Sequence, residues 1–137
     1  MTTRLLLIGD IHLGRRPSRI AEGLGLRPED LAPESAWNAS VDAAIEARAH
    51  AVLLAGDVVE RVEDRFTAFA TLEQGIRRLK QAGIAVLAVV GNHDVEALPL
   101  LAERDAGVRL LGVGSERWER VRIDGDDGSC VDLWGWS

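Results

Sequence analysis

The chain of 137 residues contains a single cysteine, Cys130, and no long uninterrupted hydrophobic run. One cysteine excludes a disulfide within the chain and a metal site built from several thiolates. No apolar stretch approaches the ~20 residues that a membrane-spanning helix needs. The N-terminal apolar stretch is too short for a signal peptide, because Asp10 interrupts it. We therefore expect a cytoplasmic protein without a membrane-bound part.

The sequence also lacks an excess of basic residues: 16 lysines and arginines stand against 22 aspartates and glutamates, which gives a net charge of −6. A protein that binds nucleic acid mainly through its overall charge should be basic, so any contact with nucleic acid must be local. Acidic side chains gathered at one site would repel phosphate unless a cation lies between them. With 47% apolar residues the chain can still bury the core of one domain.

Hydrophobic periodicity predicts alternating strands and helices. The expected strands cover residues 4–9, 51–55, 84–90 and 108–111, and the expected helices cover 34–48, 64–82 and 95–104. The last helix contains Pro99, where we expect it to begin or bend. Segments 117–124 and 129–136 alternate apolar and polar residues around a Gly-Asp-Asp-Gly turn and predict an antiparallel hairpin. This order indicates an α/β fold: a parallel central sheet with helices on its faces, followed by a C-terminal β-hairpin.

Each of the first two predicted helices has one apolar face, which is expected to pack on the sheet. Arg48 ends the first helix and can lay the stem of its side chain along that face, while Gly83 is placed to cap the second. His50 is expected to be structural, because a cation after a helix complements the helix dipole. The apolar residues at helical spacing are Trp37, Val41, Ala44 and Ile45, then Phe66, Phe69, Leu72, Ile76 and Leu79.

Three of the predicted strands end in the same way, with a glycine followed by polar residues. The three segments are GDIH at 9–12, GD at 56–57 and GNHD at 91–94. Each segment alone is more often a turn or a helix cap, but their joint occurrence predicts a site. Ligands of parallel α/β sheets bind outside the carboxyl ends of the strands. The side chains expected to meet at that edge are Asp10, His12, Asp57, Asn92, His93 and Asp94.

Carboxylates, imidazole and a carboxamide without sulfur suit a divalent ion such as Mn²⁺, Fe²⁺ or Zn²⁺. Asp57 lies in the central motif and is the natural bridge between two ions. Two ions roughly 3.5–4 Å apart can hold a hydroxide that attacks phosphorus in line with the leaving oxygen. His93 would neutralise that leaving oxygen as an acid or cation, with Asp94 orienting its ring, while Asn92 faces a metal.

The segments GDIHLG, LLAGDVVE and VVGNHD resemble the first three motifs of the calcineurin-like metallophosphoesterases. Asp-x-His followed by Leu-Gly is most similar to the DNA-repair nucleases of the SbcCD type. The resemblance implies an α/β/β/α sandwich, a site with two metal ions that is usually run on manganese, and phosphodiester hydrolysis. It places Asp10 and His12 on the first metal, Asp57 as the bridge, Asn92 on the second metal, and His93 at the scissile phosphate, supported by Asp94.

That family takes further metal-ligating histidines from a second half, in a lone-histidine motif and a later Gly-His-x-His motif. This chain contains only His12, His50 and His93. We therefore expect residues 1–137 to be the N-terminal part of a single truncated domain, with an incomplete second metal site. Glu60 stands where the nuclease relatives more often have aspartate.

Three functions stay open at this point. The first is a DNA exonuclease or repair nuclease that works with an SbcC-like ATPase partner, with Arg15, Arg16 and Arg19 holding the phosphate backbone. The second is a metal-dependent phosphatase or phosphodiesterase for a small substrate such as a nucleotide, which the acidic net charge fits. The third is a non-catalytic binding module, which associates with itself or a partner through an exposed sheet edge.

Overall fold

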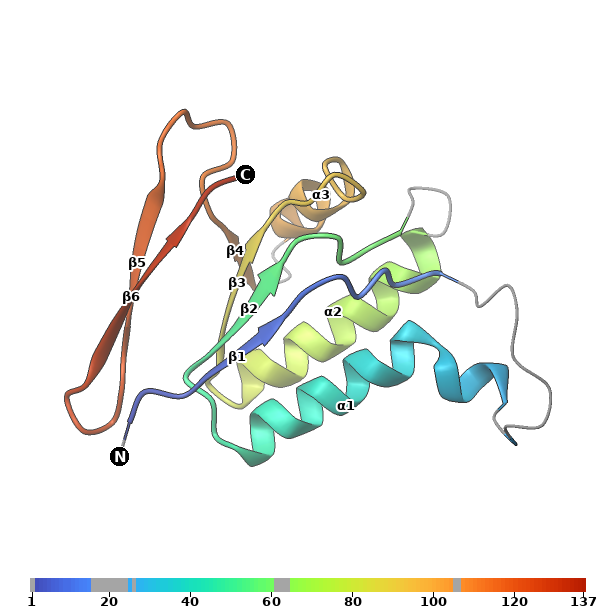
Figure 1. The fold of residues 1–137 in the computed structure, drawn as a ribbon, viewed down its shortest axis with the longest axis horizontal. Helices are drawn as coiled ribbons and strands as arrows, with labels where there is room; N and C mark the ends of the chain where they lie inside the picture. Colours follow the sequence, from blue (N-terminus) through green and yellow to red (C-terminus); the bar gives the residue numbers. More distant parts are fainter. Residues whose placement is uncertain (1, 16–24, 26, 61–64, 105–106) are drawn as a thin grey trace.

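The fold comes from a computed structural model, which describes residues 2–15, 25, 27–60, 65–104 and 107–137 (Figure 1). Its elements are β1 (Leu5–Ile8), the 3₁₀ turn η1 (Pro28–Leu31), α1 (Pro33–Glu46), β2 (Ala51–Ala55), α2 (Arg65–Gln81), β3 (Ala85–Val89), α3 (Ala97–Glu103), β4 (Val108–Leu110), β5 (Glu119–Asp124) and β6 (Cys130–Gly135). The predicted α/β fold, with a parallel sheet and a C-terminal hairpin, is confirmed.

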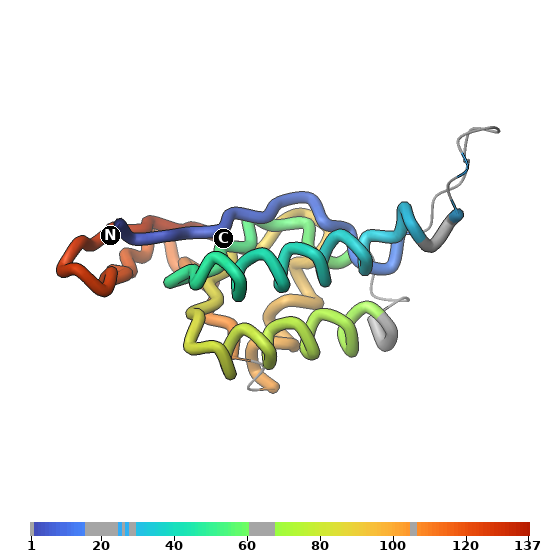
Figure 2. Tube along the Cα trace, turned by 90° about the horizontal axis from the view of Figure 1, so that it is seen from below, coloured from blue at the N-terminus to red at the C-terminus, as the bar shows by residue number. Residues whose placement is uncertain are grey.

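The four-stranded sheet has the order β1-β2-β3-β4, and each neighbouring pair is parallel. Crossovers between parallel strands are right-handed. Because each successive strand is added on the same side of the one before it, all the connecting helices lie on the same face of the sheet. The two long helices α1 and α2 lie side by side on that face (Figures 1 and 2). The opposite face is therefore left for the β5–β6 hairpin.

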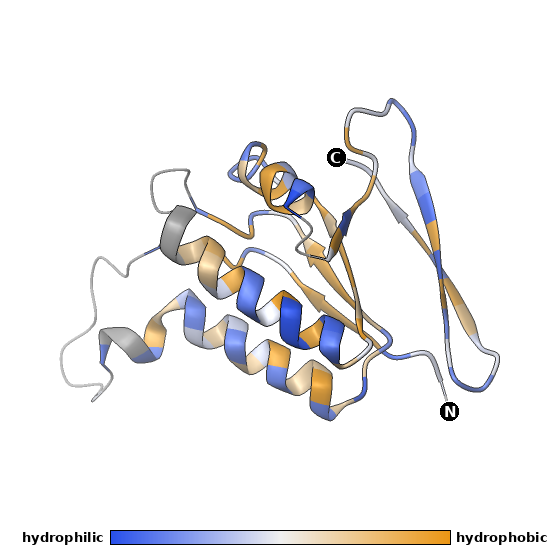
Figure 3. Cartoon of the chain, turned by 180° about the vertical axis from the view of Figure 1, so that it is seen from behind, coloured by the Kyte–Doolittle hydropathy of each residue, from blue (hydrophilic) through white to orange (hydrophobic). Residues whose placement is uncertain are grey.

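Alternate residues of the strands point to two separate cores. In β2, Val52 and Leu54 belong to the larger core under the helices, whereas Ala51 belongs to the smaller core under the hairpin. The strands of the sheet are accordingly apolar, while α1 and α2 carry both polar and apolar residues (Figure 3). The smaller core consists of Ala51, Leu87, Leu111, Val121 and Ile123.

The predicted apolar faces of the two long helices are confirmed at the described residues, and the largest buried side chain belongs to α1. Trp37 is fully buried, and its indole N–H donates to the carbonyl of Thr71 in α2 at 3.1 Å. The indole lies against Gly75, where a Cβ would collide with it. This close approach explains a glycine in the middle of a helix that it otherwise weakens.

Both long helices end in the same hydrogen-bonded motif, which corrects one prediction. Gly83 (φ +75°) donates to the carbonyl of Lys80, and Ile84 donates to that of Leu79, so the predicted glycine cap of α2 is confirmed. Arg48 takes the equivalent place after α1, with φ +50°. The prediction that the helix reaches Arg48, with the stem of that side chain along the apolar face, was wrong, because the helix ends at Glu46 and Arg48 is left-handed and exposed.

The start of α3 also differs from the sequence-based expectation. The helix begins at Ala97, two residues before Pro99, and it continues through the proline. Proline is tolerated there because the first-turn N–H groups have no partner within a helix. Most of the predicted loop 18–33 lies outside the described residues, and its end forms η1 and the beginning of α1.

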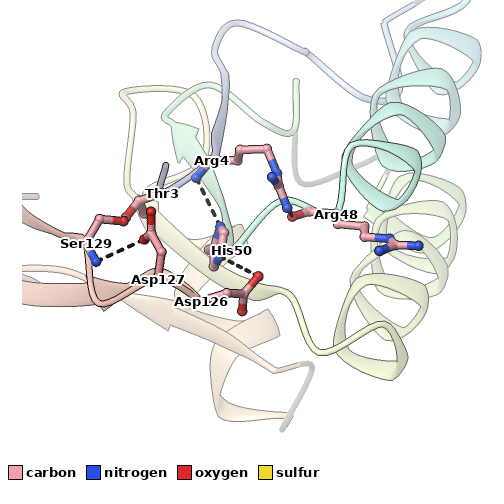
Figure 4. Close-up of polar contacts among 7 residues, drawn as sticks. All are labelled: Thr3, Arg4, Arg48, His50, Asp126, Asp127 and Ser129. Carbon is pink, nitrogen blue, oxygen red and sulfur yellow. Dashed lines mark hydrogen bonds and ion pairs between the residues drawn. The ribbon is translucent and has the colours of Figure 1, made fainter. Parts of the chain in front are cut away.

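The turn of the β5–β6 hairpin is tied to the amino-terminal ends of β1 and β2 (Figure 4). The Arg4 backbone N–H donates to His50 Nδ1 at 3.0 Å, and His50 Nε2 lies 3.4 Å from Asp126 Oδ2. The Arg4 guanidinium donates to the carbonyl of Arg48. His50 therefore helps to hold these segments together, through the hydrogen bond at Nδ1 and the contact of Nε2 with Asp126.

The other end of the hairpin is fastened to the carboxyl-terminal edge of the sheet. Ser137 Oγ accepts the Val90 N–H at 3.0 Å and donates to the carbonyl of Leu111 at 2.8 Å. Glu119, at the start of β5, accepts the Gly112 N–H at 3.0 Å and the Arg109 guanidinium at 2.8 Å. These bonds join β5 and β6 to β3 and β4.

The anchoring role of Glu119 leads to a pH-dependent prediction. Its bond from the Gly112 N–H, followed by those from Arg109, lowers the pKa of its carboxyl below the ordinary value of 4.5. A lowered pKa stabilises the fold above the unfolded-state value, and this contribution is lost as the pH falls through the folded-state value. Glu119→Gln should thus flatten the acid side of the melting-temperature profile, whereas Glu116→Gln, an exposed change in the preceding loop, should leave it unaltered. Parallel profiles for all three proteins would contradict this.

The described residues contain no helix that has both the length and the apolar character to cross a membrane.

Candidate metal centre

The loops after β1 and β2 continue side by side beyond the ends of the strands. The His12 N–H donates to the carbonyl of Asp57 at 2.9 Å, and Leu13 forms a parallel bridge with Val59. Leu13 and Val59 are fully buried, so the two loops are anchored in the core. The parallel register of the strands thereby carries over into the polar segments and sets them next to each other.

Three of the predicted ligands share an uncommon backbone conformation. Asp10, His12 and Asp57 have φ of +52°, +51° and +51°, and Arg48 is the one other non-glycine residue of the described chain with positive φ. This left-handed region is sparsely populated by residues other than glycine. Strained residues persist where the surrounding structure holds them, and they concentrate at functional sites. Here the buried bridge beyond His12 and Asp57 supplies that constraint.

The same three side chains converge on one point. Asp10, His12 and Asp57 each offer a ligand atom, and these atoms all lie within 4.8 Å of one another. Asp10 is exposed, whereas His12 and Asp57 are half-buried. Two carboxylates and an imidazole with this spacing can surround a single cation, and they open toward solvent on one side. As predicted, these three side chains lie close together at the edge of the sheet.

The third loop, after β3, is fixed to the second by Asp94. This side chain is fully buried, and its two oxygens accept the Val58 N–H and the Gly91 N–H, each at 2.7 Å. Burial raises the pKa of the Asp94 carboxyl, while the two N–H bonds act in the opposite direction. The contact differs from the predicted one with the His93 ring: Asp94 positions two backbone segments.

His93 lies where the three loops meet. Its backbone N–H donates to Asp57 Oδ1 at 3.0 Å, which orients that carboxylate. Its exposed ring stands edge-on to the ring of His12, with centroids 5.0 Å apart. The structure thus brings His93 to the candidate ligands and leaves its ring open to a substrate.

Sequence reasoning did not select Glu60 as a site residue, although its carboxylate lies in this centre. His12, Glu60 and His93 form a second group of possible ligands within 4.8 Å of one another. Glu60 Oε2 lies 2.7 Å from His12 Nδ1. The sequence feature that could have indicated Glu60 is its acidic side chain, three positions after the candidate ligand Asp57 that follows β2.

The remaining predicted site residues stay untested. Asn92 is exposed in the loop between Gly91 and His93, and its assignment as a ligand remains a prediction. Arg15 is exposed and its N–H donates to the carbonyl of His12 at 3.0 Å, so it follows directly on the first motif. Arg16 and Arg19 lie outside the described residues.

The donor set fits a divalent cation of the hard or borderline type. Oxygen and imidazole ligands suit Mn²⁺, Zn²⁺ or Fe²⁺, and the described centre contains no thiolate that would favour a softer ion. The parallel strands and the buried bridge hold Asp10, His12 and Asp57 in place. These residues can therefore hold a cation without a large rearrangement of the backbone.

Comparison with known proteins gives three agreeing results. A family model described as calcineurin-like phosphoesterase matches residues 3–135. The chain is 33% identical over 95 residues to the DNA double-strand break repair protein Mre11 of Aeropyrum pernix, a match that covers 69% of this chain and 22% of the relative. It is also similar in fold to the nuclease MPE of Pseudomonas putida, with a TM-score of 0.54, 21% identity, and coverage of 80% of this chain and 48% of that one. The chain thus spans less than half the length of these relatives.

Proposed function

Because the chain belongs to the calcineurin-like phosphoesterase family of metal-dependent hydrolases, we propose that it takes part in phosphodiester hydrolysis on DNA. The convergence of Asp10, His12 and Asp57 at the edge of the sheet carries the proposal. The similarity to Mre11 supports DNA as the substrate. The partial coverage of both relatives supports the prediction that residues 1–137 are one part of a single domain.

The proposed roles rest on the convergence of Asp10, His12 and Asp57 and, for Asn92, on the sequence motif alone. Asp10, His12 and Asp57 would hold one divalent ion, and Asp57 and Asn92 would contribute ligands to a second. When bound, such ions polarise phosphoryl oxygens and make water a better nucleophile. The exposed ring of His93 donates a proton to the leaving oxygen or neutralises its charge. Mn²⁺ is the metal that we propose.

The similarity to Mre11 also suggests the partners that we propose. A Mre11-like nuclease would work with an SbcC-like ATPase in the cytoplasm, and Arg15 would contact the phosphate backbone together with Arg16 and Arg19. The strand β1 lies at an edge of the sheet and could pair with a second copy or a partner. A small phosphodiester substrate is the second candidate, because the net charge of −6 does not favour a polyanion.

The deciding experiment compares the two substrate classes under one set of conditions. The full-length protein, including any residues beyond Ser137, is incubated with Mn²⁺ and either linear duplex DNA or a nitrophenyl phosphodiester, over a series of salt concentrations, with EDTA as the control. We expect shortening of the DNA that needs Mn²⁺ and falls steeply with salt, since phosphate contacts release counterions. Hydrolysis of the small ester alone would favour the second candidate. Absence of metal-dependent hydrolysis of both substrates would contradict the proposal.

A further inference from the structure

We infer that Glu60 is a positioning residue, whose carboxylate fixes the tautomer of His12 and so presents the other ring nitrogen, Nε2, to the cation site. The inference deepens the proposed function and rests on it for the identity of the metal centre. It starts from the 2.7 Å separation of Glu60 Oε2 and His12 Nδ1. Both side chains are largely buried, with 17% and 16% exposed, and neither atom forms a hydrogen bond in the described part of the chain, so the ion-pair contact is the interaction that these two atoms have.

The separation of these two atoms favours a direct ion-pair contact over two ligands of a shared cation. Two ligands of a tetrahedral zinc, each about 2.0–2.2 Å from the ion, lie roughly 3.3–3.6 Å apart. Two neighbouring ligands of an octahedral magnesium, at about 2.0–2.1 Å, lie roughly 2.8–3.0 Å apart. The observed 2.7 Å is shorter than either and is an ion-pair separation, which a proton on Nδ1 stabilises, because an unprotonated Nδ1 would set its lone pair against the carboxylate. The contact therefore indicates that Glu60 holds the His12 ring at Nδ1, on the side opposite the nitrogen that would face the cation.

Backbone hydrogen bonds between the loops after β1 and β2 bring these two side chains together. The Leu13 N–H donates to the carbonyl of Val58 at 2.8 Å, and the Glu60 N–H donates to the carbonyl of Leu13 at 3.0 Å. Leu13 and Val58 are fully buried. This short parallel ladder sets the relative position of residues 12 and 60, so their contact does not depend on a freely moving loop.

The chemical consequence concerns which nitrogen of His12 is free. A neutral imidazole carries one proton, so a proton held on Nδ1 by Glu60 leaves the lone pair of Nε2 available. Carboxylates that accept the second N–H of a ligand histidine fix its orientation and raise its basicity, and their loss typically costs 10–100-fold in metal affinity. Asp10 and Asp57 complete the group that this nitrogen would join.

His50 provides an internal contrast within the same chain. Its Nδ1 accepts the Arg4 N–H at 3.0 Å, so the neutral ring must carry its proton on Nε2. His12 and His50 are therefore expected to be opposite tautomers. With three histidines in the sequence, their nitrogen signals can be separated and assigned.

The test is nitrogen NMR of the metal-free protein, labelled at its histidine rings and studied at alkaline pH, where histidine side chains are neutral. We expect a protonated Nδ1 in His12 and a protonated Nε2 in His50. Glu60→Ala should release His12 into a mixture of tautomers, and Glu60→Gln, which keeps an acceptor oxygen without the charge, should give an intermediate result. Glu46→Ala, an exposed change in α1, is the control and should leave both signals in place.

Calorimetry with Mn²⁺ on the same proteins completes the test. We expect Glu60→Ala to weaken Mn²⁺ binding by about 10–100-fold. A weakened affinity with an unchanged His12 tautomer would make Glu60 a direct ligand and overturn the inference, as would a wild-type His12 protonated on Nε2. The expected tautomers in a wild-type protein that hydrolyses no phosphodiester would uphold the role of Glu60 and reject the proposed function. Thermal melts verify folding, and Glu60→Gln serves for comparison if the alanine variant unfolds.

Discussion

Replacing Asp57 by asparagine is expected to weaken Mn²⁺ binding by more than about 100-fold, because even the partners of metal ligands contribute 10–100-fold. Hydrolysis should fall by at least the same factor in kcat/KM. Asp57 contributes a carboxylate to the group with Asp10 and His12, and its central place makes it the proposed bridge. Calorimetry with Mn²⁺ and steady-state kinetics measure the two effects separately.

Asparagine is the informative substitution at this position for two reasons. It tolerates the left-handed conformation, φ +51°, that Asp57 adopts, and its amide oxygen can still accept the His93 N–H. The fold should therefore survive while the ligand charge is lost. Asp42→Asn, which removes an exposed charge paired with Arg78 between α1 and α2, is the matched control and should change Mn²⁺ affinity less than twofold. Equal affinities for the two variants would remove Asp57 from the metal site.

The fold was predictable where single physical signals dominate. Continuous apolar runs are typical of strands in parallel sheets, and the runs before Gly9, Gly56 and Gly91 predicted β1, β2 and β3. The parallel arrangement followed from the alternation of strands and helices. The end of α1 was missed because the left-handed position after a helix is usually glycine, and Arg48 occupies it here.

The candidate site was predictable to the extent that its residues end strands. Asp10, His12 and Asp57 follow β1 and β2 directly, and neighbouring parallel strands bring their carboxyl ends together. Glu60 was missed because its place depends on the bridge between Leu13 and Val59. That bridge extends the pairing of β1 and β2 past the point where the apolar pattern stops, so no local signal reveals it.

The role of Asp94 could not be read from the sequence for a related reason. Adjacent residues in a tight loop point in different directions, so proximity to His93 in the chain did not imply contact between the side chains. The carboxylate turns inward and is fully buried, and it accepts N–H bonds from Val58 and Gly91. A buried polar group must find such partners, but which partners it finds depends on the packing of two separate loops.

The second large effect is expected from replacing Gly91 by alanine, which should lower the free energy of unfolding by roughly 3 kcal/mol. Gly91 does not have positive φ, so the reason is space. An added Cβ would lie 2.8 Å from Asp57 Cγ and closer still to the backbone nitrogen of Asp57. The loop after β2 must then move away from the loop after β3. This displaces the Asp57 carboxylate and strains the Val58 bond to Asp94. Urea unfolding measures the loss of stability.

Gly9→Ala is the matched control, because it adds the same methyl group to the equivalent position after β1. There the nearest heavy atom is Ala55 Cβ at 3.6 Å, an ordinary contact. This variant should change the free energy of unfolding by less than about 1 kcal/mol and should keep its Mn²⁺ affinity, whereas Gly91→Ala should lose most of it. If both variants bind Mn²⁺ like the wild type, the close packing of the second and third loops does not set the geometry of the metal centre. The ligands would then have to be held by the first and second loops alone, through the ladder that joins His12 to Asp57.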